Sequence, residues 1–160
     1  MDRTMTTHEG KYLTFTLDGE EYGIAIRKVK EIIGMMAITY VPQTPGFVKG
    51  VINLRGKVIP VVDLRLKFGM EAIEYTERTC IIVVEIRNHD NDIQIGTVVD
   101  TVSEVLNIKE DEVEDTPTFG SHFDARFMLG MAKLGAEVKI LLDIDEVLDL
   151  EERALLNKVV

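Results

Sequence analysis

The feature that most constrains the fold of this 160-residue chain is an internal repeat. Residues 22–33 resemble residues 95–106, and residues 47–64 resemble residues 127–144. The two matches occur in the same order along the chain, and self-similarity of this kind indicates repeated structural units. We therefore expect two similar units rather than one irregular fold.

The positions kept in both copies are mostly glycines, apolar residues and acids. They are Gly23 and Gly96, Val29 and Val102, Glu31 and Glu104, Gly50 and Gly130, Leu54 and Leu134, Val58 and Val138, and Asp63 and Asp143. The first match has an offset of 73 residues and the second an offset of 80, so the second copy has a longer middle connection, which contains the acidic residues 110–115. A unit of about 60 to 70 residues is only marginally stable alone, so the two units should share a packed seam.

Hydrophobic periodicity predicts a chain that is mostly β. The expected strands are residues 12–17, 21–26, 80–86 and 93–99, together with hairpins over 47–64 and 127–142. Helical spacing, with Val29, Ile32 and Ile33 on one side, predicts a short amphipathic helix over residues 27–33, and a similar pattern predicts another over residues 100–106. A helix over residues 143–157 should close the chain. Short strands in two copies favour paired small β-barrels.

The same pattern of strands and polar stretches suggests how the chain is divided. Residues 1–10 are expected to form a flexible tail, and residues 11–158 a single domain. Within that domain we expect one subdomain over about 11–78 and another over about 79–150, followed by the closing helix. The pattern leaves open whether strands are exchanged between the two subdomains.

The hairpin over residues 47–64 carries polar residues that the second copy lacks. The first copy has Asn53, Arg55, Gly56 and Pro60, where the second has Lys133, Gly135, Ala136 and Ile140. The repeated frame therefore does not require the sequence Asn-Leu-Arg-Gly at its turn. Two interpretations stay open: this turn is a functional site, or the second copy has simply drifted and Arg55 is a solvated turn residue.

Charge and composition exclude several classes of partner. The chain has 18 basic and 28 acidic residues, a formal net charge of −10, which argues against binding to nucleic acid or to an anionic membrane surface. The single cysteine, Cys80, excludes an internal disulfide and suits a reducing compartment. No signal peptide is recognisable, and no apolar run approaches the ~20 residues that span a bilayer. The sequence predicts a soluble cytoplasmic protein.

No motif for catalysis, a metal or a cofactor emerges. The three histidines, His8, His89 and His122, do not lie beside a plausible nucleophile. Two acidic clusters, at residues 90–92 and 143–146, lack the glycine and the terminal glutamate of a calcium-binding loop. A non-enzymatic binding module is the better interpretation, because the seam between two small barrels can accept a partner helix. The competing class is a catalytic or ligand-sensing barrel.

A family resemblance rests on specific residues. Tyr22-Gly23-Ile24 with Val29 and Glu31, and then the segment from Pro45 to Phe68 containing Gly-Val-Ile-Asn-Leu-Arg-Gly, closely resemble the CheW family of bacterial chemotaxis coupling proteins. The resemblance continues through residues 96–106 to residues 154–156, so it covers nearly the whole chain.

This resemblance implies two SH3-like five-stranded barrels and a non-catalytic adaptor without cofactor or metal. It implies as partners the cytoplasmic tip helices of methyl-accepting chemotaxis receptors and the regulatory domain of the histidine kinase CheA, at receptor arrays on the inner face of the membrane. The positions that match the family's contact residues are Val29, Glu31, Gly50, Asn53 and Arg55, with Val105 and Phe119 in the second half. An apolar groove at the seam that includes Val29 would then accept a receptor helix, and Arg55 would either contact the partner or orient the groove.

Overall fold

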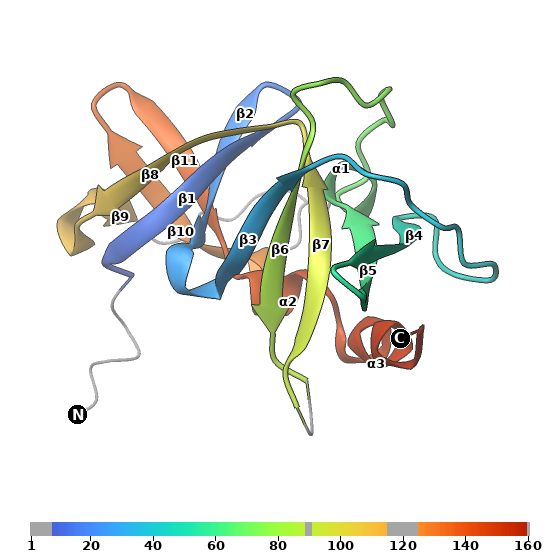
Figure 1. Ribbon diagram of the computed structural model, residues 1–160. Coiled ribbons are helices and arrows are strands. Elements are labelled where there is room, and N and C mark those ends of the chain that lie inside the picture. Colours follow the sequence, from blue (N-terminus) through green and yellow to red (C-terminus); the bar gives the residue numbers. More distant parts are fainter. Residues whose placement is uncertain (1–7, 89–90, 115–124, 160) are drawn as a thin grey trace.

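The computed structural model describes residues 8–88, 91–114 and 125–159 (Figure 1). The strands are β1 Gly10–Leu17, β2 Glu20–Ala25, β3 Val29–Gly34, β4 Val48–Leu54, β5 Lys57–Asp63, β6 Cys80–Ile86, β7 Ile93–Val99, β8 Thr101–Ile108, β9 Val113–Glu114, β10 Met128–Leu134 and β11 Glu137–Leu142. The helices are α1 Leu64–Lys67, α2 Ile144–Val147 and α3 Leu150–Val159, and 3₁₀ turns occupy Ile26–Lys28, Glu110–Glu112 and Ala125–Phe127. The prediction of a mostly β chain is confirmed.

The strands form two sheets, and each sheet draws strands from both copies of the repeat. One sheet has the order β8-β1-β2-β11-β10-β9, and the other has the order β3-β6-β7-β5-β4. Hairpin pairs are antiparallel, whereas β2 with β11 and β5 with β7 are parallel. The chain therefore crosses between the sheets after β2 and again after β7. Where to divide residues 11–158 into subdomains stays a prediction.

In each sheet the chain that leaves one end strand returns to the strand at the other end. After β3, Thr39 forms an isolated bridge with Val51 of β4, with N···O distances of 2.8 and 2.9 Å in the two directions. After β8, the short strand β9 pairs with β10, so that Glu114 lies opposite Met131. Val51 and Met131 are equivalent in the repeat, so the difference between six and five strands reflects only the length of this last pairing.

The two hairpins of the repeat are built alike. Both contain an irregularity in register at the same place, between Val48 and Gly50 in β4 and between Met128 and Gly130 in β10. Each hairpin leads into a one-turn helix that an aspartate caps. Asp63 Oδ1 accepts from the Arg65 amide at 2.9 Å, and Asp143 Oδ1 accepts from the Asp145 amide at 3.1 Å.

Two of the predicted helices are wrong. Residues 27–33 form the end of a 3₁₀ turn followed by strand β3, in which Val29, Glu31 and Ile33 are half-buried and the residues between them are exposed. Residues 100–106 lie almost entirely in strand β8. Both strands are end strands of a sheet, where one polar face weakens the alternation, and pairing with β6 and β1 overrides the local pattern.

The closing helix is present but is divided. It consists of α2 and α3, because the chain is extended at Leu148, which is fully buried. No helix among residues 8–88, 91–114 and 125–159 is both long and apolar enough to cross a bilayer.

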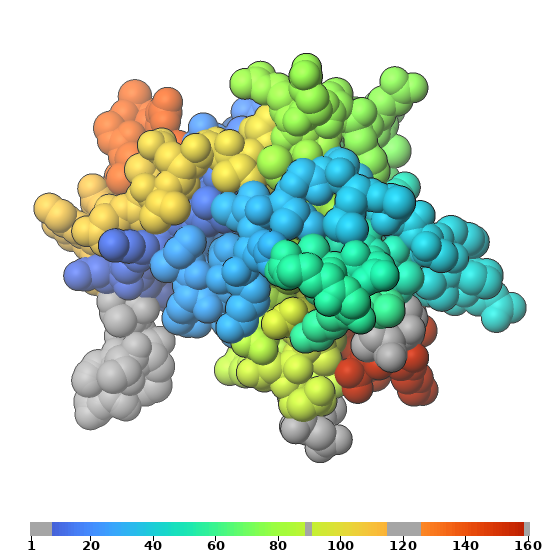
Figure 2. All heavy atoms as spheres, viewed as in Figure 1, coloured from blue at the N-terminus to red at the C-terminus, as the bar shows by residue number. Residues whose placement is uncertain are grey.

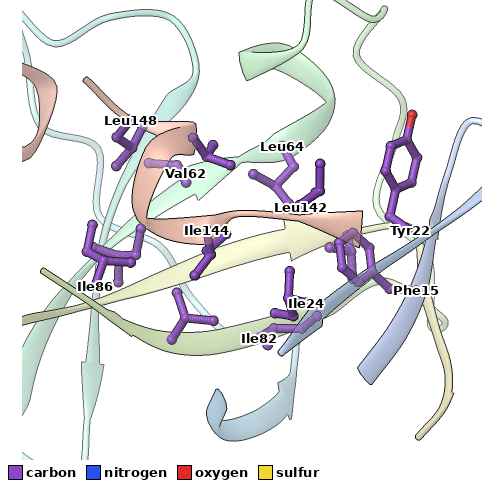
Figure 3. Close-up of a cluster of buried hydrophobic side chains, with 14 of the residues drawn as sticks. Phe15, Tyr22, Ile24, Val62, Leu64, Ile82, Ile86, Leu142, Ile144 and Leu148 are labelled. Atoms are coloured by element: carbon purple, nitrogen blue, oxygen red, sulfur yellow. The ribbon is translucent and has the colours of Figure 1, made fainter. Parts of the chain in front are cut away.

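The largest hydrophobic cluster lies between the two sheets. Figure 3 shows side chains from both sheets and from the short helices meeting there, including Phe15, Tyr22, Ile82, Leu142 and Leu148. Smaller clusters lie within each sheet, one around Ile81 and Val83 and another around Tyr12 and Leu141. Because β6 is buried on both faces, it contributes alternate residues to the shared cluster and to its own sheet's cluster. The two sheets therefore share a packed seam, to which both copies of the repeat contribute.

Candidate interaction site

The turn between β4 and β5 holds a charged residue, Arg55, in a left-handed backbone conformation. Arg55 and Gly56 both have positive φ, 52° and 86°, which is the conformation of a type I′ hairpin turn. The side-chain oxygen of Asn53 accepts a hydrogen bond from the Gly56 amide at 2.8 Å and so fixes the turn. Residues other than glycine and asparagine are uncommon at this φ. The positive φ of Arg55 therefore strains the backbone.

The Arg55 guanidinium forms a two-pronged ion pair with the carboxylate of Glu31. Nη1 donates to Oε2 at 3.0 Å, and Nη2 donates to Oε1. Glu31 lies on β3, and Figure 2 shows the blue segment that contains β3 beside the blue-green tip of the β4–β5 hairpin. The pair joins two segments that are 24 residues apart in sequence. Bidentate pairing of this kind fixes the direction of the guanidinium as well as its position.

This ion pair is accessible to a partner. The Arg55 side chain is 68% exposed and that of Glu31 is 28% exposed. The hydrogen bonds from Arg55 lower the pKa of the Glu31 carboxyl, and the same bonds raise the pKa of Arg55. Both groups are therefore held in their charged forms, and we call Glu31, Asn53 and Arg55 the hairpin-tip site.

Two other expected site residues lie on the same strands but are less exposed. Val29 is half-buried at the start of β3 and packs against the cluster between the sheets. Gly50 is buried in β4 at a φ of 140°, and a Cβ there would lie 2.0 Å from the carbonyl oxygen of Thr39. Gly50 thus permits the close crossing of the chain after β3, and its role in partner contact stays a prediction.

The two expected residues of the second half belong elsewhere. Val105 is 50% exposed on β8, in the other sheet, opposite Leu13 of β1. Phe119 lies outside the described residues, and so do residues 115–124 around it. The structure therefore brings Glu31, Asn53 and Arg55 together and places Val105 on a different sheet.

Strand β3 also carries an exposed apolar residue that the predicted helix did not indicate. Ile32 is 43% exposed, although the predicted helix placed it on the buried face with Val29 and Ile33. The signal that would have found it is the alternation of a strand, because the exposed Ile32 lies between the half-buried Glu31 and Ile33. Its repeat equivalent is Val105, so the two sheets expose an apolar residue at matching places.

The second hairpin has a different tip. At the position of Asn53 it has Lys133, whose Nζ lies 2.6 Å from Glu114 Oε2, with side chains 53% and 60% exposed. At the position of Arg55 it has Gly135, with a φ of 65°. The second tip therefore carries an exposed ion pair, but its first turn residue, Gly135, has no side chain.

Comparison with known proteins agrees with this architecture. The CheW-like domain family matches residues 11–152. The chain is 40% identical to the chemotaxis protein CheW of Klebsiella aerogenes, over 93% of this chain and 87% of that protein. It is 34% identical to the chemotaxis protein CheW of Rhizobium meliloti, over 93% of this chain and 94% of that protein.

A solved structure is also similar. The crystal structure of the scaffolding protein TtCheW from Thermoanaerobacter tengcongensis superimposes with a TM-score of 0.79 at 35% identity, covering 90% of this chain and 95% of that one. The family match extends over most of the chain, and the sequence relatives cover it nearly end to end. The chain belongs to the CheW family of chemotaxis scaffolding proteins.

Proposed function

We propose that this protein is the adaptor that couples the cytoplasmic tips of chemoreceptors to the histidine kinase CheA and supports receptor control of kinase activity. Chemotaxis and scaffolding are the roles that the names of its relatives state. A scaffold of this family is non-catalytic, so its chemistry is that of recognition. The proposed location is the cytoplasm, at receptor arrays on the inner face of the membrane.

The observation that carries the proposal is Arg55 at the hairpin tip. Its backbone is strained where the equivalent residue of the second hairpin, Gly135, is free of a side chain. A turn chosen for stability would favour glycine or asparagine at this place. Strain that persists at an exposed, charged residue is typical of functional positions.

The geometry suggests how a receptor helix would dock. The guanidinium points along a fixed direction and offers donors to carbonyl or carboxylate oxygens of a partner. Ile32 and the partly buried Val29, on the neighbouring β3, offer apolar surface. A receptor helix with an apolar stripe flanked by hydrogen-bond acceptors fits this combination.

The kinase would dock on a different part of the molecule. Val105, which is exposed on β8, is the proposed contact for the regulatory domain of CheA. Phe119, which lies outside the described residues, stays a predicted contact for the same partner. Transient interfaces of this kind are small and individually weak, and arrays with many simultaneous contacts supply avidity. The two proposed surfaces belong to different sheets, which leaves both partners room to bind together.

Reconstitution of receptor-dependent kinase activity tests the proposal. Purified receptor tip, CheA and this protein should give kinase activity that depends on the receptor, and omission of this protein should abolish that dependence. Arg55→Ala should lower receptor binding at least about tenfold. The matched control is Lys133→Ala, which removes an exposed cation from the equivalent hairpin. Equal loss in both variants would place the receptor site elsewhere.

A charge swap separates the two roles left open for Arg55. Glu31→Arg combined with Arg55→Glu keeps an opposite-charge pair between β3 and the turn. If Arg55 contacts the receptor directly, the swapped protein binds as poorly as Arg55→Ala. If Arg55 only orients the groove, receptor binding returns. Val29→Glu should also weaken receptor binding, and wild-type binding of both partners by Val29→Glu and Arg55→Ala would contradict the site assignment.

A further inference from the structure

The chain crosses between its two sheets at equivalent points of the repeat. The first crossover is the 3₁₀ turn Ile26–Lys28, between β2 and β3, and the second is Asp100, between β7 and β8. In the repeat, Arg27 is equivalent to Asp100, so one crossover carries basic residues where the other carries an acid.

An ion pair ties each crossover to the short helix of the opposite half. At the first crossover, Lys28 Nζ lies 2.7 Å from Asp145 Oδ2, and the side chains are 19% and 6% exposed. At the second, Arg65 Nη1 lies 2.7 Å from Asp100 Oδ2, and the side chains are 8% and 18% exposed. The two pairs have the same length and nearly the same burial.

The polarity of the two pairs is reversed. Arg65 on α1 and Asp145 on α2 are equivalent in the repeat, and the short helix is therefore basic in the first half and acidic in the second. Each also has a partner in its own half. Asp18 Oδ1 lies 3.6 Å from Arg65 Nη2, and Arg87 donates its amide to Asp145 Oδ1 at 2.8 Å.

Burial makes this arrangement consequential for pairing. A charge taken out of water is tolerated only beside an opposite charge, and a mismatch at such a place costs several kcal/mol. If two copies of the first half were paired, Arg65 would face Arg27 and Lys28. If two copies of the second half were paired, Asp145 would face Asp100. Both mismatches would bring like charges together.

We propose that the Lys28–Asp145 and Arg65–Asp100 pairs are a recognition device that makes the two halves complementary to each other and not to themselves. When the two halves of a chain have the same architecture, a competing structure is a dimer. In that dimer the first halves of two molecules pair with each other, and so do the second halves. Charge reversal at the two crossovers disfavours that structure while leaving the shared frame unchanged. Selection against a competing assembly by like-charge contacts is a general route to specificity.

Two double variants with the same net charge as the wild type test this proposal. The matched variant, Lys28→Asp with Asp145→Lys, restores an opposite-charge pair at the first crossover. The mismatched variant, Lys28→Asp with Asp100→Lys, puts like charges at both crossovers within the chain and relieves the like-charge contact between second halves. Each single reversal should lower the melting temperature by about 10 °C.

We expect the matched variant to regain much of the loss that either of its single reversals causes. The hydrogen bond from the Arg87 amide to Asp145 is lost both in Asp145→Lys and in the matched variant, so its contribution cancels from the coupling between the two reversals. The mismatched variant should melt below both of its single reversals. After refolding at high concentration it should also show a larger fraction of slowly dissociating dimer, measured by size-exclusion chromatography with light scattering.

Two results would overturn the proposal. Equal melting temperatures for the two double variants would show that the ion pairs do not make the two halves complementary. Equal dimer fractions would show that they do not disfavour the pairing of like halves. If reversed side chains prevent folding, neutral substitutions give the same comparison. Lys28→Met with Asp145→Asn should then show a favourable coupling that Lys28→Met with Asp100→Asn does not.

Discussion

The β4–β5 and β10–β11 hairpins share their frame and differ at their tips. In both, a register shift precedes a glycine, a crossing segment of chain lies against that glycine, and an aspartate caps the helix that follows. The tip of the first is a turn with positive φ at both central residues, Arg55 and Gly56. In the second, of the two central residues only Gly135 has positive φ, as in a type II′ turn.

The difference separates what the fold needs from what a partner would use. The register shift, the glycine behind it and the capping aspartate occur in both hairpins, whereas a charged residue with a strained backbone occurs only in the first. Asn53 and Glu31 both serve that residue, one by fixing the turn and the other by orienting the guanidinium. The frame determines stability, and we expect the first tip to determine function.

The largest expected effect is at the glycines of the frame. A Cβ at Gly50 would lie 2.0 Å from the carbonyl oxygen of Thr39, and a Cβ at Gly130 would lie 2.7 Å from that of Glu114. Both contacts are with backbone and cannot be relieved by a rotamer change. We expect Gly50→Ala to lower the free energy of unfolding by about 3 kcal/mol and Gly130→Ala by about 2 kcal/mol.

Chemical denaturation of the two variants measures this comparison. Gly46→Ala is a control, because a Cβ there meets nothing within 4 Å and its φ is not in the left-handed region. A loss at Gly50 no greater than that at Gly46 would show that the crossing segment moves aside easily. The packing around Gly50 would then tolerate a larger side chain than the shared glycines indicate.

A smaller effect is expected at the two turns. Arg55→Gly and Arg55→Ala both remove the guanidinium, but only glycine relieves the backbone at a φ of 52°. We therefore expect Arg55→Gly to melt at a higher temperature than Arg55→Ala. In the second turn glycine is the natural residue, so Gly135→Ala should lower the free energy of unfolding by about 1 kcal/mol.

Thermal melts of these three variants, together with receptor binding, sharpen the distinction between frame and tip. Arg55→Gly should bind receptor as poorly as Arg55→Ala while being the more stable of the two. If the two variants melted at the same temperature, the strain assigned to Arg55 would be wrong, and with it the strongest reason to regard this turn as functional.

The frame could be predicted from the sequence because its signals are local and occur twice. Gly50 and Gly130, the apolar alternation and the two capping aspartates each mark the same place in both copies, so the hairpins were predicted correctly. β3 and β8 were not, because each is an end strand with one exposed face. Ile32 and Ile33 are adjacent in sequence and fit a helix as well as a strand until pairing with β6 decides between them.

The contact between members of the candidate site could not be predicted from the sequence. Arg55 and Glu31 were both expected site residues, yet nothing local indicates that they meet. Their contact depends on where the chain crosses from one sheet to the other and on the return of Thr39 to β4. The φ of Arg55 likewise follows from the two-residue turn that the register of β4 and β5 imposes.

The smallest effect concerns the protonation of Glu31. Because hydrogen bonds from Arg55 lower its pKa in the folded protein, the ion pair contributes stability that is present above the ordinary pKa of a glutamate. That contribution is lost as the pH falls through the lowered value. A carboxyl-detected NMR titration of Glu31 should show a higher midpoint in Arg55→Ala than in the wild type and no change in Lys133→Ala. An unchanged midpoint in Arg55→Ala would mean that the ion pair between Glu31 and Arg55 does not persist in solution. The first tip would then hold Arg55 no more rigidly than the second tip holds Lys133.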